Sequence, residues 1–355
     1  MKGLILSGGK GTRLRPITHT RAKQLVPVAN KPVLHYGLEA LVAAGIRDIG
    51  IVVGDTQAEI RESVGDGSKW NARVTYIEQD APRGLAHAVL ISEAFINGDR
   101  FVMYLGDNLL NRGITTLVEE FDREKPAAQV LLARVPDPQM FGVAELSDGR
   151  VIRLVEKPAE PKSNLALVGV YMFSPEVFTS VRNIKPSFRN ELEITDAIQN
   201  LIDRGLDVRP HIVEGWWKDT GKLEDMLEAN RLILDTVEAC VQGQVDAESR
   251  VEGKVIVAAG AVIERSVVRG PAIIGAGARI INAYVGPFTS IGEGTEIRDT
   301  EIEHSIVLEG ARITDLASRI EDSLIGRNVT IRRMPVRPTA YRFMLGDNSE
   351  VGIRW

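Results

Sequence analysis

Residues 4–13 read Leu-Ile-Leu-Ser-Gly-Gly-Lys-Gly-Thr-Arg, a short apolar run that leads directly into a glycine-rich loop. The apolar run has the length and composition of a buried strand. The glycines leave room for backbone N–H groups to approach phosphate oxygens, and Arg13 and Lys23 are suited to neutralising a polyphosphate. Taken alone, such a loop fits an ordinary strand exit as well as a phosphate site.

The loop does not match either of two common phosphate motifs. Leu14 stands where a dinucleotide-binding fingerprint needs its last glycine. The spacing that a Walker A loop needs before Gly-Lys-Ser/Thr is also absent. The rest of the chain therefore has to decide what the loop does.

From residue 1 to about 235, short apolar runs alternate with longer amphipathic segments. The predicted strands are Leu4–Leu6, Ile49–Val53, Arg73–Ile77, Phe101–Leu105 and Gln129–Ala133. The predicted helices are Val33–Ala44, Ala86–Phe95 and Thr115–Glu124. This alternation predicts an α/β domain with a largely parallel sheet. Ligands of such sheets bind at the carboxyl ends of the strands, so the residues after Leu6 and Leu105 are the first candidates.

After a last predicted helix at Lys222–Glu238, the pattern changes to a repeat of six residues. Aliphatic side chains recur at Ile256, Val262, Val268, Ile274 and Ile280, then after one-residue slips at Val285, Ile291, Ile297, Ile302 and Leu308. Small residues follow four positions later at Gly260, Ser266, Ala272, Ala278, Thr289 and Thr295. Neither a helix nor a flat sheet has this period, whereas stacked β-helix coils do. In such coils we expect each of these aliphatic residues to stack on the coil below, inside the column, and the small residues to fit the corners. We predict one domain at 1–240 and a parallel β-helix domain with a C-terminal tail at 241–355.

Composition narrows the class of protein. The 355 residues carry a net charge of −5, so there is no basic excess of the kind that binds nucleic acid. Cys240 is the only cysteine, which excludes an intrachain disulfide and fits a reducing cytoplasm. No apolar run approaches the ~20 residues that a membrane-spanning helix needs. We therefore expect a cytoplasmic protein without nucleic-acid or membrane partners.

Two isolated aspartates, each close to a glycine, are candidate metal ligands. Asp107 ends the apolar strand in Leu105-Gly106-Asp107-Asn108, and Asp219 lies in Trp217-Lys218-Asp219-Thr220-Gly221. Carboxylates are hard oxygen ligands suited to Mg2+. Either aspartate alone is more often a cap or a turn residue, so the residues by themselves leave both readings open.

The loop and the segments after it resemble a known family. The sequence Gly8-Gly9-Lys10-Gly11-Thr12-Arg13-Leu14-Arg15-Pro16-Ile17-Thr18, followed by Lys23-Gln24-Leu25-Val26-Pro27-Val28, looks like the opening signature of sugar nucleotidylyltransferases. Residues 1 to about 240 resemble glucose-1-phosphate thymidylyltransferases, and the repeat resembles the extension of their long-chain members. The resemblance implies that residues 1–240 form a catalytic domain of Rossmann-like nucleotidyltransferase type with a mixed, mostly parallel sheet, and that the β-helix at 241–355 is left-handed. Together the two parts cover essentially the whole chain.

The resemblance implies roles for residues of this loop and of a second segment. It implies that the triphosphate is held by Gly8, Gly9, Gly11, Thr12 and Arg13, and that Lys23 lies near the α-phosphate. Gln24, Gln79 and Gly84 match positions that read the base, with Gln24 typical of thymidylyl transfer. A side-chain amide can accept from N3–H of thymine or uracil and donate to O4. Without the resemblance, the segment Pro82–Gly84 reads as a turn into a helix.

The resemblance also implies a metal site and a sugar site. It assigns Mg2+ to Asp107 and Asp219, and it gives Asp107 a part in nucleotide binding and catalysis together with Arg13 and Lys23. For the sugar phosphate it points to Asn108, Gly142, Glu156, Lys157, Leu167 and Trp217. On bare sequence, Glu156 and Lys157 read as a solvated surface pair. The segment Glu191–Asp196 also matches a family motif, although helix capping explains it equally well.

The expected reaction is glucose 1-phosphate + dTTP → dTDP-glucose + pyrophosphate, with Mg2+ as cofactor. One alternative is a UTP-using sugar-1-phosphate uridylyltransferase, and another is a non-catalytic regulatory subunit on the same scaffold. Acetyl transfer in the repeat domain would need a histidine base, and His304 is the only histidine in the sequence of that region. We expect the repeat domain to support a homo-oligomer, and the apolar tail Arg337–Trp355 to fold back on the helix or on a neighbour.

Overall fold

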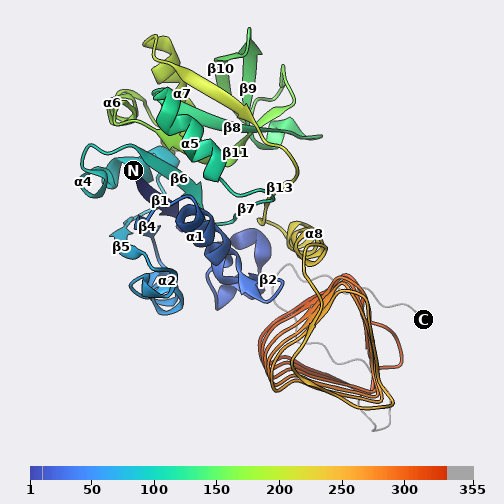
Figure 1. Ribbon diagram of the computed structural model, residues 1–355. Helices are drawn as coiled ribbons and strands as arrows, with labels where there is room; N and C mark the ends of the chain where they lie inside the picture. The colour runs from blue at the N-terminus through green and yellow to red at the C-terminus, as the bar shows by residue number, and fades with distance from the viewer. Residues whose placement is uncertain (10, 334–355) are drawn as a thin grey trace. The chain divides into compact units, whose positions relative to one another are not determined.

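The computed structural model describes residues 1–9 and 11–333, which form two compact units (Figure 1). The first unit comprises residues 1–9, Ala22–Leu25 and Val33–Asp219. The second comprises Gly11–Arg21, Val26–Pro32 and the described chain from Thr220 onward. This division differs from the predicted boundary after residue 240, and two short N-terminal segments belong with the C-terminal part. The tail Arg337–Trp355 lies outside the described residues.

The first unit is built on a nine-stranded mixed sheet with the order β10-β9-β11-β6-β1-β4-β5, and β8 and β12 extend from β11. Its strands are β1 (Lys2–Leu6), β4 (Asp48–Val53), β5 (Arg73–Glu78), β6 (Phe101–Leu105), β8 (Ala128–Arg134), β9 (Gly142–Ser147), β10 (Arg150–Glu156), β11 (Leu165–Phe173) and β12 (Val208–Ile212). β1 runs parallel to β4 and β6, and β4 to β5. β11 runs antiparallel to β6, β8 and β9. The predicted α/β class is confirmed.

Helices cover both faces of this sheet because its central strands are apolar on both sides. They are α1 (Val33–Ala43), α2 (Gln57–Val64), α3 (Leu85–Ile91), α4 (Glu93–Ile96), α5 (Thr115–Glu124), α6 (Glu176–Asn183) and α7 (Ile194–Asp203). One core layer gathers around Leu4 and Phe101, the other around Ile5 and Tyr104. Since neighbouring residues of one strand point to opposite faces, each central strand feeds both layers. Short 3₁₀ turns lie at Lys23–Leu25 (η3), Ser68–Trp70 (η4) and Pro138–Met140 (η5).

Two predicted helices differ from the sequence pattern. The segment predicted at Ala86–Phe95 is divided into α3 and α4 at Ser92, whose hydroxyl donates to the Ala88 carbonyl at 2.7 Å and competes with the helical hydrogen bond. The last helix, α8 (Leu223–Leu234), ends four residues before the predicted Glu238, and just after it the Thr236 hydroxyl donates to the Ile233 carbonyl at 2.7 Å.

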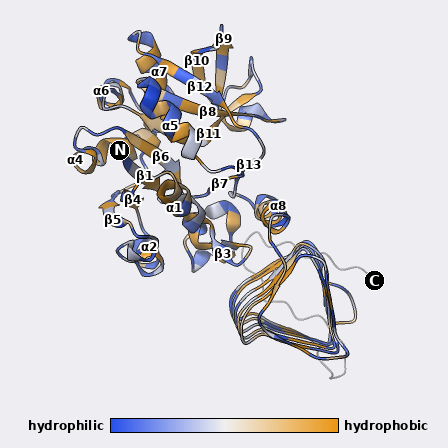
Figure 2. Ribbon diagram, viewed as in Figure 1, coloured by the Kyte–Doolittle hydropathy of each residue, from blue (hydrophilic) through white to orange (hydrophobic). Residues whose placement is uncertain are grey.

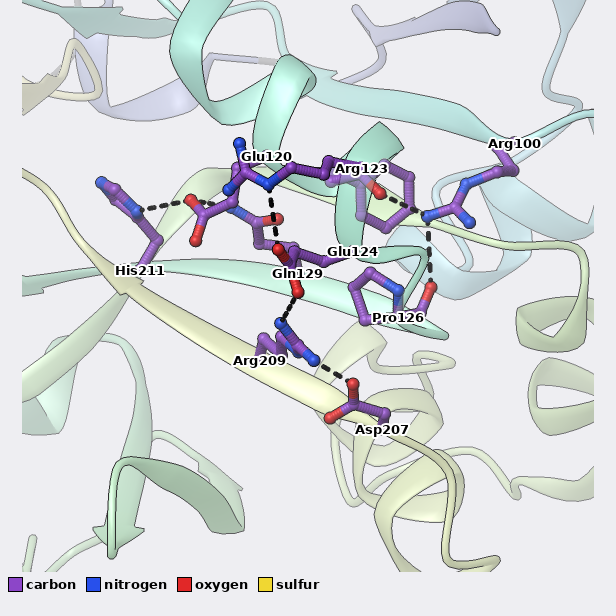
Figure 3. Close-up of polar contacts among 10 residues, drawn as sticks. Arg100, Glu120, Arg123, Glu124, Pro126, Gln129, Asp207, Arg209 and His211 are labelled. Atoms are coloured by element: carbon purple, nitrogen blue, oxygen red, sulfur yellow. Dashed lines mark hydrogen bonds and ion pairs between the residues drawn. The ribbon is translucent and has the colours of Figure 1, made fainter.

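A polar network fastens the strand β12 and the helix α5 to β8 (Figure 3). Arg209 donates to Asp207 and to Glu124, each at 2.8 Å, and the His211 ring lies 3.3 Å from Glu120. Arg100 donates to two backbone carbonyls nearby. β12 pairs only with β8 among the described strands, so charged side chains along it also discourage the addition of a foreign strand.

The second unit contains a column of stacked coils whose strands form three parallel sheets (Figure 1). The first sheet holds β14 (Cys240–Val241), β17 (Val255–Val257), β20 (Ala272–Ile274), β23 (Thr289–Ile291), β26 (Ile306–Val307) and β28 (Leu324–Ile325). The second holds β15 (Gln244–Val245), β18 (Val262–Glu264), β21 (Arg279–Ile281), β24 (Glu296–Arg298), β27 (Arg312–Thr314) and β29 (Thr330–Arg332). The third holds β16 (Arg250–Glu252), β19 (Val267–Arg269), β22 (Tyr284–Val285) and β25 (Glu301–Ile302).

Stacked positions lie about 17 residues apart, as in Val257, Ile274 and Ile291, and these aliphatic residues are buried in the core of the column. The hydropathy colouring of the ribbon shows hydrophobic residues recurring along the coils (Figure 2). The arrangement is consistent with the predicted left-handed β-helix. The same unit includes η1 (Thr12–Leu14), η2 (Ile17–His19), the hairpin β2 (Pro27–Val28) and β3 (Lys31–Pro32), and α8.

The predicted inward register is wrong in the first coil. Ile256 and Val262 are only partly buried, whereas Val257 and Ile263 are fully buried in the column. Likewise Gly260 is exposed, with a left-handed φ of 76°, and Ala261 takes the buried corner. Three sides of six residues would make a coil of 18, so a coil of 17 residues needs one side of five. The first five-residue side lies between Ile263 and Val268, and the regular spacing of six in the sequence did not indicate it.

Candidate active site

The glycine-rich loop leaves β1 at the carboxyl edge of the sheet. The Ser7 N–H donates to the Val52 carbonyl at 2.9 Å, which fixes the start of the loop beside β4. Gly9 and Gly11 adopt φ values of 120° and 58°, conformations that residues with a side chain rarely take. The element that begins directly after Gly11 is the single 3₁₀ turn η1 and not an α-helix. Any anion at the loop would therefore be held by backbone N–H groups and side chains rather than by a helix dipole.

The predicted triphosphate residues are divided between the units. Gly8 and Gly9 belong to the first unit, and Gly11, Thr12 and Arg13 to the second. Within the second unit, the Thr18 hydroxyl donates to the Gly11 carbonyl at 2.6 Å and so closes the loop on itself.

Lys23 and Asp107, which are far apart in the sequence, form an ion pair at the carboxyl edge of the sheet. The Lys23 ammonium contacts Asp107 Oδ2, and both side chains are about 85% buried, with 16% and 14% exposed. Burial by itself would raise the pKa of the Asp107 carboxyl, but the Lys23 ammonium outweighs burial and holds that pKa below its usual value. Asp107 therefore stays ionised, and the pair supplies a positive and a negative group at the place where α/β sheets bind ligands.

Asn108 links the strands around this pair. Its amide group donates to Asp107 at 2.9 Å and accepts from the Gly169 N–H at 3.2 Å and from the Trp217 indole at 2.5 Å. Gly169 has to be glycine, because a Cβ there would lie 2.6 Å from Asn108 Oδ1. Both ends of the Asn108 amide are thus engaged within the protein, and the residue orients its neighbours.

Asp219 comes next to Asp107 through strand pairing. The strand β13 (Trp217–Asp219) runs antiparallel to β7 (Asn108–Leu110), with Asp219 opposite Asn108. This register places the second predicted metal ligand one residue away from the first. Among the described residues, no group of three or more His, Cys, Asp or Glu side chains could hold a metal by itself.

Gln79, the predicted base-reading residue, follows β5 beside a cavity of about 410 Å3. The cavity is lined by Val53, Gly54, Asp55, Gln57, Glu78, Gln79 and Asp80. Gln79 Nε2 lies 3.5 Å from the Gly84 carbonyl and 3.0 Å from His87 Nδ1. Because a carbonyl can only accept, the amide nitrogen faces both groups, and His87 Nδ1 is the acceptor.

His87 had no signal in the sequence beyond its place three residues after Gly84. Burial, followed by the Arg83 guanidinium, lowers the pKa of the His87 ring from its ordinary 6.5, so the ring is neutral at neutral pH and can accept this hydrogen bond. Gly84 itself has a φ of 102°, and a Cβ there would lie 2.3 Å from the Leu192 carbonyl oxygen. The geometry thus orients the Gln79 amide oxygen away from His87.

Gln24 lies under the loop. Its side chain is 1% exposed, and Nε2 donates to the Gly8 carbonyl at 3.4 Å. Its Oε1 is buried and has no hydrogen-bond partner in the described chain. The structure therefore connects Gln24 to the loop backbone.

The predicted sugar residues Gly142, Glu156 and Leu167 meet at one place. Gly142 pairs with Glu156 across β9 and β10, and a Cβ at Gly142 would lie 2.7 Å from Thr195 and 2.9 Å from Leu167. Lys157 Nζ lies 3.6 Å from Glu156. Burial raises the pKa of the Glu156 carboxyl, an effect that nearby Lys157 only partly offsets.

Arg189 also lies at this place, although nothing in the sequence singled it out. Its guanidinium lies 3.4 Å from Glu156, 2.9 Å from Glu191 and 3.7 Å from Glu193. The available signal was the motif Glu191–Asp196. The structure shows the start of α7 within this motif, but the N-cap residue Glu193 makes no side-chain capping hydrogen bond, so the helix start is confirmed and the capping is not. Trp217 packs its ring edge-to-face on Phe141, the neighbour of Gly142, at 5.4 Å between centroids.

Comparisons with known proteins place this geometry in a family. Residues 2–236 match the family model described as nucleotidyl transferase. The chain is 56% identical to a glucose-1-phosphate thymidylyltransferase of Streptomyces antibioticus over 100% of both chains, and 58% identical to one of Streptomyces griseus over 99% of both.

The chain belongs to the nucleotidyl transferase family. A solved structure from Bacillus anthracis, described as a glucose-1-phosphate thymidylyltransferase in complex with sucrose, is 39% identical with a TM-score of 0.62 and covers 65% of this chain and 94% of its own. The match to the nucleotidyl transferase family ends at residue 236, just before the first strand of the stacked coils. In the part of the chain that the structure describes, no helix is both long and apolar enough to cross a membrane.

Proposed function

We propose that this nucleotidyltransferase joins dTTP to glucose 1-phosphate, releasing pyrophosphate and forming dTDP-glucose. The observation that carries the proposal is the buried Lys23–Asp107 ion pair at the carboxyl edge of the sheet, with Asp219 beside it in register. Relatives named glucose-1-phosphate thymidylyltransferase match the whole chain, which supports the same substrates.

The base pocket would lie at the cavity beside Gln79. With its nitrogen turned toward Gly84 and His87, the Gln79 amide presents its oxygen, which suits the N3–H of thymine or uracil. Adenine and cytosine carry an acceptor at the corresponding ring nitrogen, so this oxygen would face them unfavourably. The preference for dTTP over UTP then depends on room for the 5-methyl group and on the missing 2′-hydroxyl.

The sugar would bind at the cluster around Glu156. A half-buried carboxylate accepts hydrogen bonds from sugar hydroxyls, and the closeness of Gly142 to Thr195 and Leu167 leaves room only for a residue without a side chain. Lys157, whose ammonium lies 3.6 Å from Glu156, is the group that we propose for the phosphate of the sugar ester.

The reaction is an in-line displacement. A phosphate oxygen of glucose 1-phosphate attacks the α-phosphorus of dTTP, the new P–O bond forms, and the bond to the β-phosphate oxygen breaks to release pyrophosphate. The attacking oxygen is already anionic, so no general base is needed. The protein contributes positioning and positive charge, with Lys23 near the α-phosphate and Arg13 on the leaving phosphates.

The carboxylates fit a magnesium ion, which is the cofactor that we propose. Mg2+ in phosphoryl-transfer sites binds through one or two carboxylates and completes its shell with phosphate oxygens and water. Asp107, held ionised by Lys23, and Asp219, opposite Asn108, provide that donor set. When bound, the ion would neutralise charge on the phosphates.

Two alternatives remain testable within the family. UTP would fit the same Gln79 contact, so a uridylyltransferase is the nearest rival. A regulatory subunit would have no need of a buried lysine–aspartate pair, which argues for catalysis. For acetyl transfer, His304 contacts Asp322 through Nδ1 and packs edge-to-face on Phe288, contacts within the coils that need no second substrate. We also propose, as the sequence suggested, a cytoplasmic homo-oligomer.

Pyrophosphate release tests the proposal. The rate should be measured with glucose 1-phosphate and each of dTTP, UTP, CTP, ATP and GTP, with Mg2+ present or chelated. We expect dTTP to give the highest kcat/KM, UTP to follow, and turnover to stop without Mg2+. A best rate with CTP or ATP would overturn the assignment of Gln79, a best rate with GTP would overturn the proposed nucleotide, and turnover unaffected by chelation would overturn the metal site.

A further inference from the structure

The second unit holds both chain segments that flank Lys23. The chain belongs to the second unit at Gly11–Arg21, to the first at Ala22–Leu25, and to the second again at Val26–Pro32. The central segment contains the lysine of the buried ion pair, and the preceding one contains three of the residues that we propose for the triphosphate. What fixes these flanks therefore bears on nucleotide binding.

Asn230 on α8 fixes the downstream flank. Its side chain is fully buried; Oδ1 accepts from the Ala29 N–H at 2.9 Å and from the Ser290 hydroxyl at 2.7 Å, and Nδ2 donates to the Phe288 carbonyl at 2.9 Å. One asparagine thereby joins the β2–β3 hairpin, α8 and a coil of the β-helix. Asn30, next in the same hairpin, donates to the Ile291 carbonyl at 2.7 Å.

A charged cluster on the β-helix fixes the upstream flank. Arg21 donates to Glu309 at 3.1 Å, and Arg327 donates to the same carboxylate oxygen at 3.3 Å. The Arg21 side chain is mostly buried, with 17% exposed, so this pair is less screened than a surface pair. The backbone of Gly326 lies beside Ile17, since a Cβ there would be 3.4 Å from Ile17 Cδ1.

We propose that the β-helix unit positions the segment Gly11–Arg21, which follows the first glycines of the loop, with Asn230 and Glu309 as positioning residues. This segment has almost no regular structure of its own, only the short turns η1 and η2, so its conformation depends on what it packs against. Anchoring it before binding reduces the ordering cost that the nucleotide would otherwise have to meet. This gives the repeat domain a role in nucleotide affinity, in addition to architecture.

The test uses full-length variants and rests in part on the proposed function. In Asn230→Ala and Glu309→Ala, we expect the KM for dTTP to rise about 5- to 50-fold, while the KM for glucose 1-phosphate stays within twofold. The split follows because the residues proposed for the sugar lie in the first unit. A loss of folded protein alone would lower kcat and leave both KM values unchanged, so the split separates positioning from stability.

Glu252→Ala is the matched control. Glu252 is also a half-exposed β-helix carboxylate, paired with Arg269 at 3.1 Å, but neither residue contacts the flanks of Lys23. We expect this variant to keep both KM values. Glu309→Gln retains an oxygen that can accept from Arg21, and its effect should fall between those of Glu309→Ala and wild type.

Hydrogen exchange separates the inference from the proposed function, because it needs no substrate. Amides of residues 11–21 and 26–32 should exchange faster in Glu309→Ala and Asn230→Ala than in wild type, and those of the central sheet should not. If Asn230→Ala does not fold, Glu309→Ala alone decides. Unchanged exchange of the flanks together with an unchanged KM for dTTP would overturn the inference. Faster exchange in a protein whose wild type does not use dTTP would instead overturn the assigned substrate.

Discussion

The β-helix and the carboxyl edge of the first unit's sheet use β-strands in opposite ways. In the β-helix, each strand repeats the one below it, so Val257, Ile274 and Ile291 stack like on like. At the sheet edge no two strands end alike: β1 leads into a glycine loop, β5 into Gln79 and β6 into Asp107. Repetition gives a uniform column with little chemical variety, whereas unlike strand ends bring unlike groups to one place. This contrast predicts chemistry at the edge and architecture in the column.

The strongest test of the contrast is loss of a charge at the edge. Asp107→Asn should lower kcat by roughly 100- to 1,000-fold, the usual cost of removing one electrostatic contact to a reacting group. Asp219→Asn should behave similarly, with the largest deficit at limiting Mg2+. Rates of pyrophosphate release across a Mg2+ series would measure both.

Asp48→Asn is the control for this experiment. Asp48 begins β4, at the opposite edge of the same sheet, and pairs with Arg73 at 2.9 Å. It should keep the wild-type rate. Near-normal turnover of both Asp107→Asn and Asp219→Asn at limiting Mg2+ would move the chemistry away from this edge.

Within the column, substitutions are expected to change the free energy of unfolding. The size of the change should depend on whether the substituted residue is fully buried. Ile263→Ala should lower the free energy of unfolding by about 2–5 kcal/mol, because Ile263 is fully buried and its loss leaves a cavity. Ile256→Ala, in the same coil but half-exposed, should cost about 1 kcal/mol or less. Urea unfolding followed by circular dichroism compares the two, and equal losses would contradict the 17-residue register. Turnover of the folded variants should be normal.

A smaller effect is expected from the base contact. Gln79→Leu should weaken kcat/KM for dTTP and UTP together by about 1–3 kcal/mol, since the N3–H of the base loses its acceptor. The KM for glucose 1-phosphate should not change. Steady-state kinetics with both nucleotides provide the measurement, and a loss confined to one of them would show that Gln79 reads something other than the shared edge of the two bases.

The smallest expected effect is a pH dependence from His87. Its pKa is lowered, so the ring remains neutral through neutral pH and takes up a proton only below its ordinary 6.5. Protonated Nδ1 cannot accept from Gln79, and the KM for dTTP should therefore rise a few-fold as pH falls below that value. The neighbouring charges Arg83 and Asp80 act on the ring in opposite directions, and the lowered pKa shows that burial and Arg83 prevail.

His87→Gln isolates this contribution. A glutamine oxygen can accept the same hydrogen bond and does not titrate. Titration of the nucleotide's own phosphates affects both proteins equally, so the quantity to compare is the ratio of their KM values for dTTP from pH 8 to pH 5.5. A ratio that does not change with pH would remove His87 from the orientation of Gln79.

Local patterns in the sequence were sufficient for five strands of the main sheet, for the helical segments at α1, α3–α4, α5 and α8, for the β-helix and for the position of Asp107 at a strand end. They did not predict the strands β9 to β12 or the helices α2, α6 and α7. Period and composition depend on neighbours along the chain, and the physics behind them acts over a few residues. The one-residue error at Ile256 and Val262 shows the limit of such patterns. A repeat gives the number of residues per side of a coil but does not show where a side is shortened, because that is decided by stacking on the next coil.

Only the tertiary structure decided which residues work together. Lys23 and Asp107 are 84 positions apart, and the strand pairing that brings Asp219 beside them joins segments more than 100 residues apart. Arg189 beside Glu156, His87 against Gln79 and the anchoring of Gly11–Arg21 on the β-helix depend likewise on long-range packing. No local pattern encodes such pairs, since each partner alone has the composition of a turn, a cap or a solvated surface. The sequence determined the elements and their candidate chemistry; packing of the sheet and of the coils determined which side chains meet.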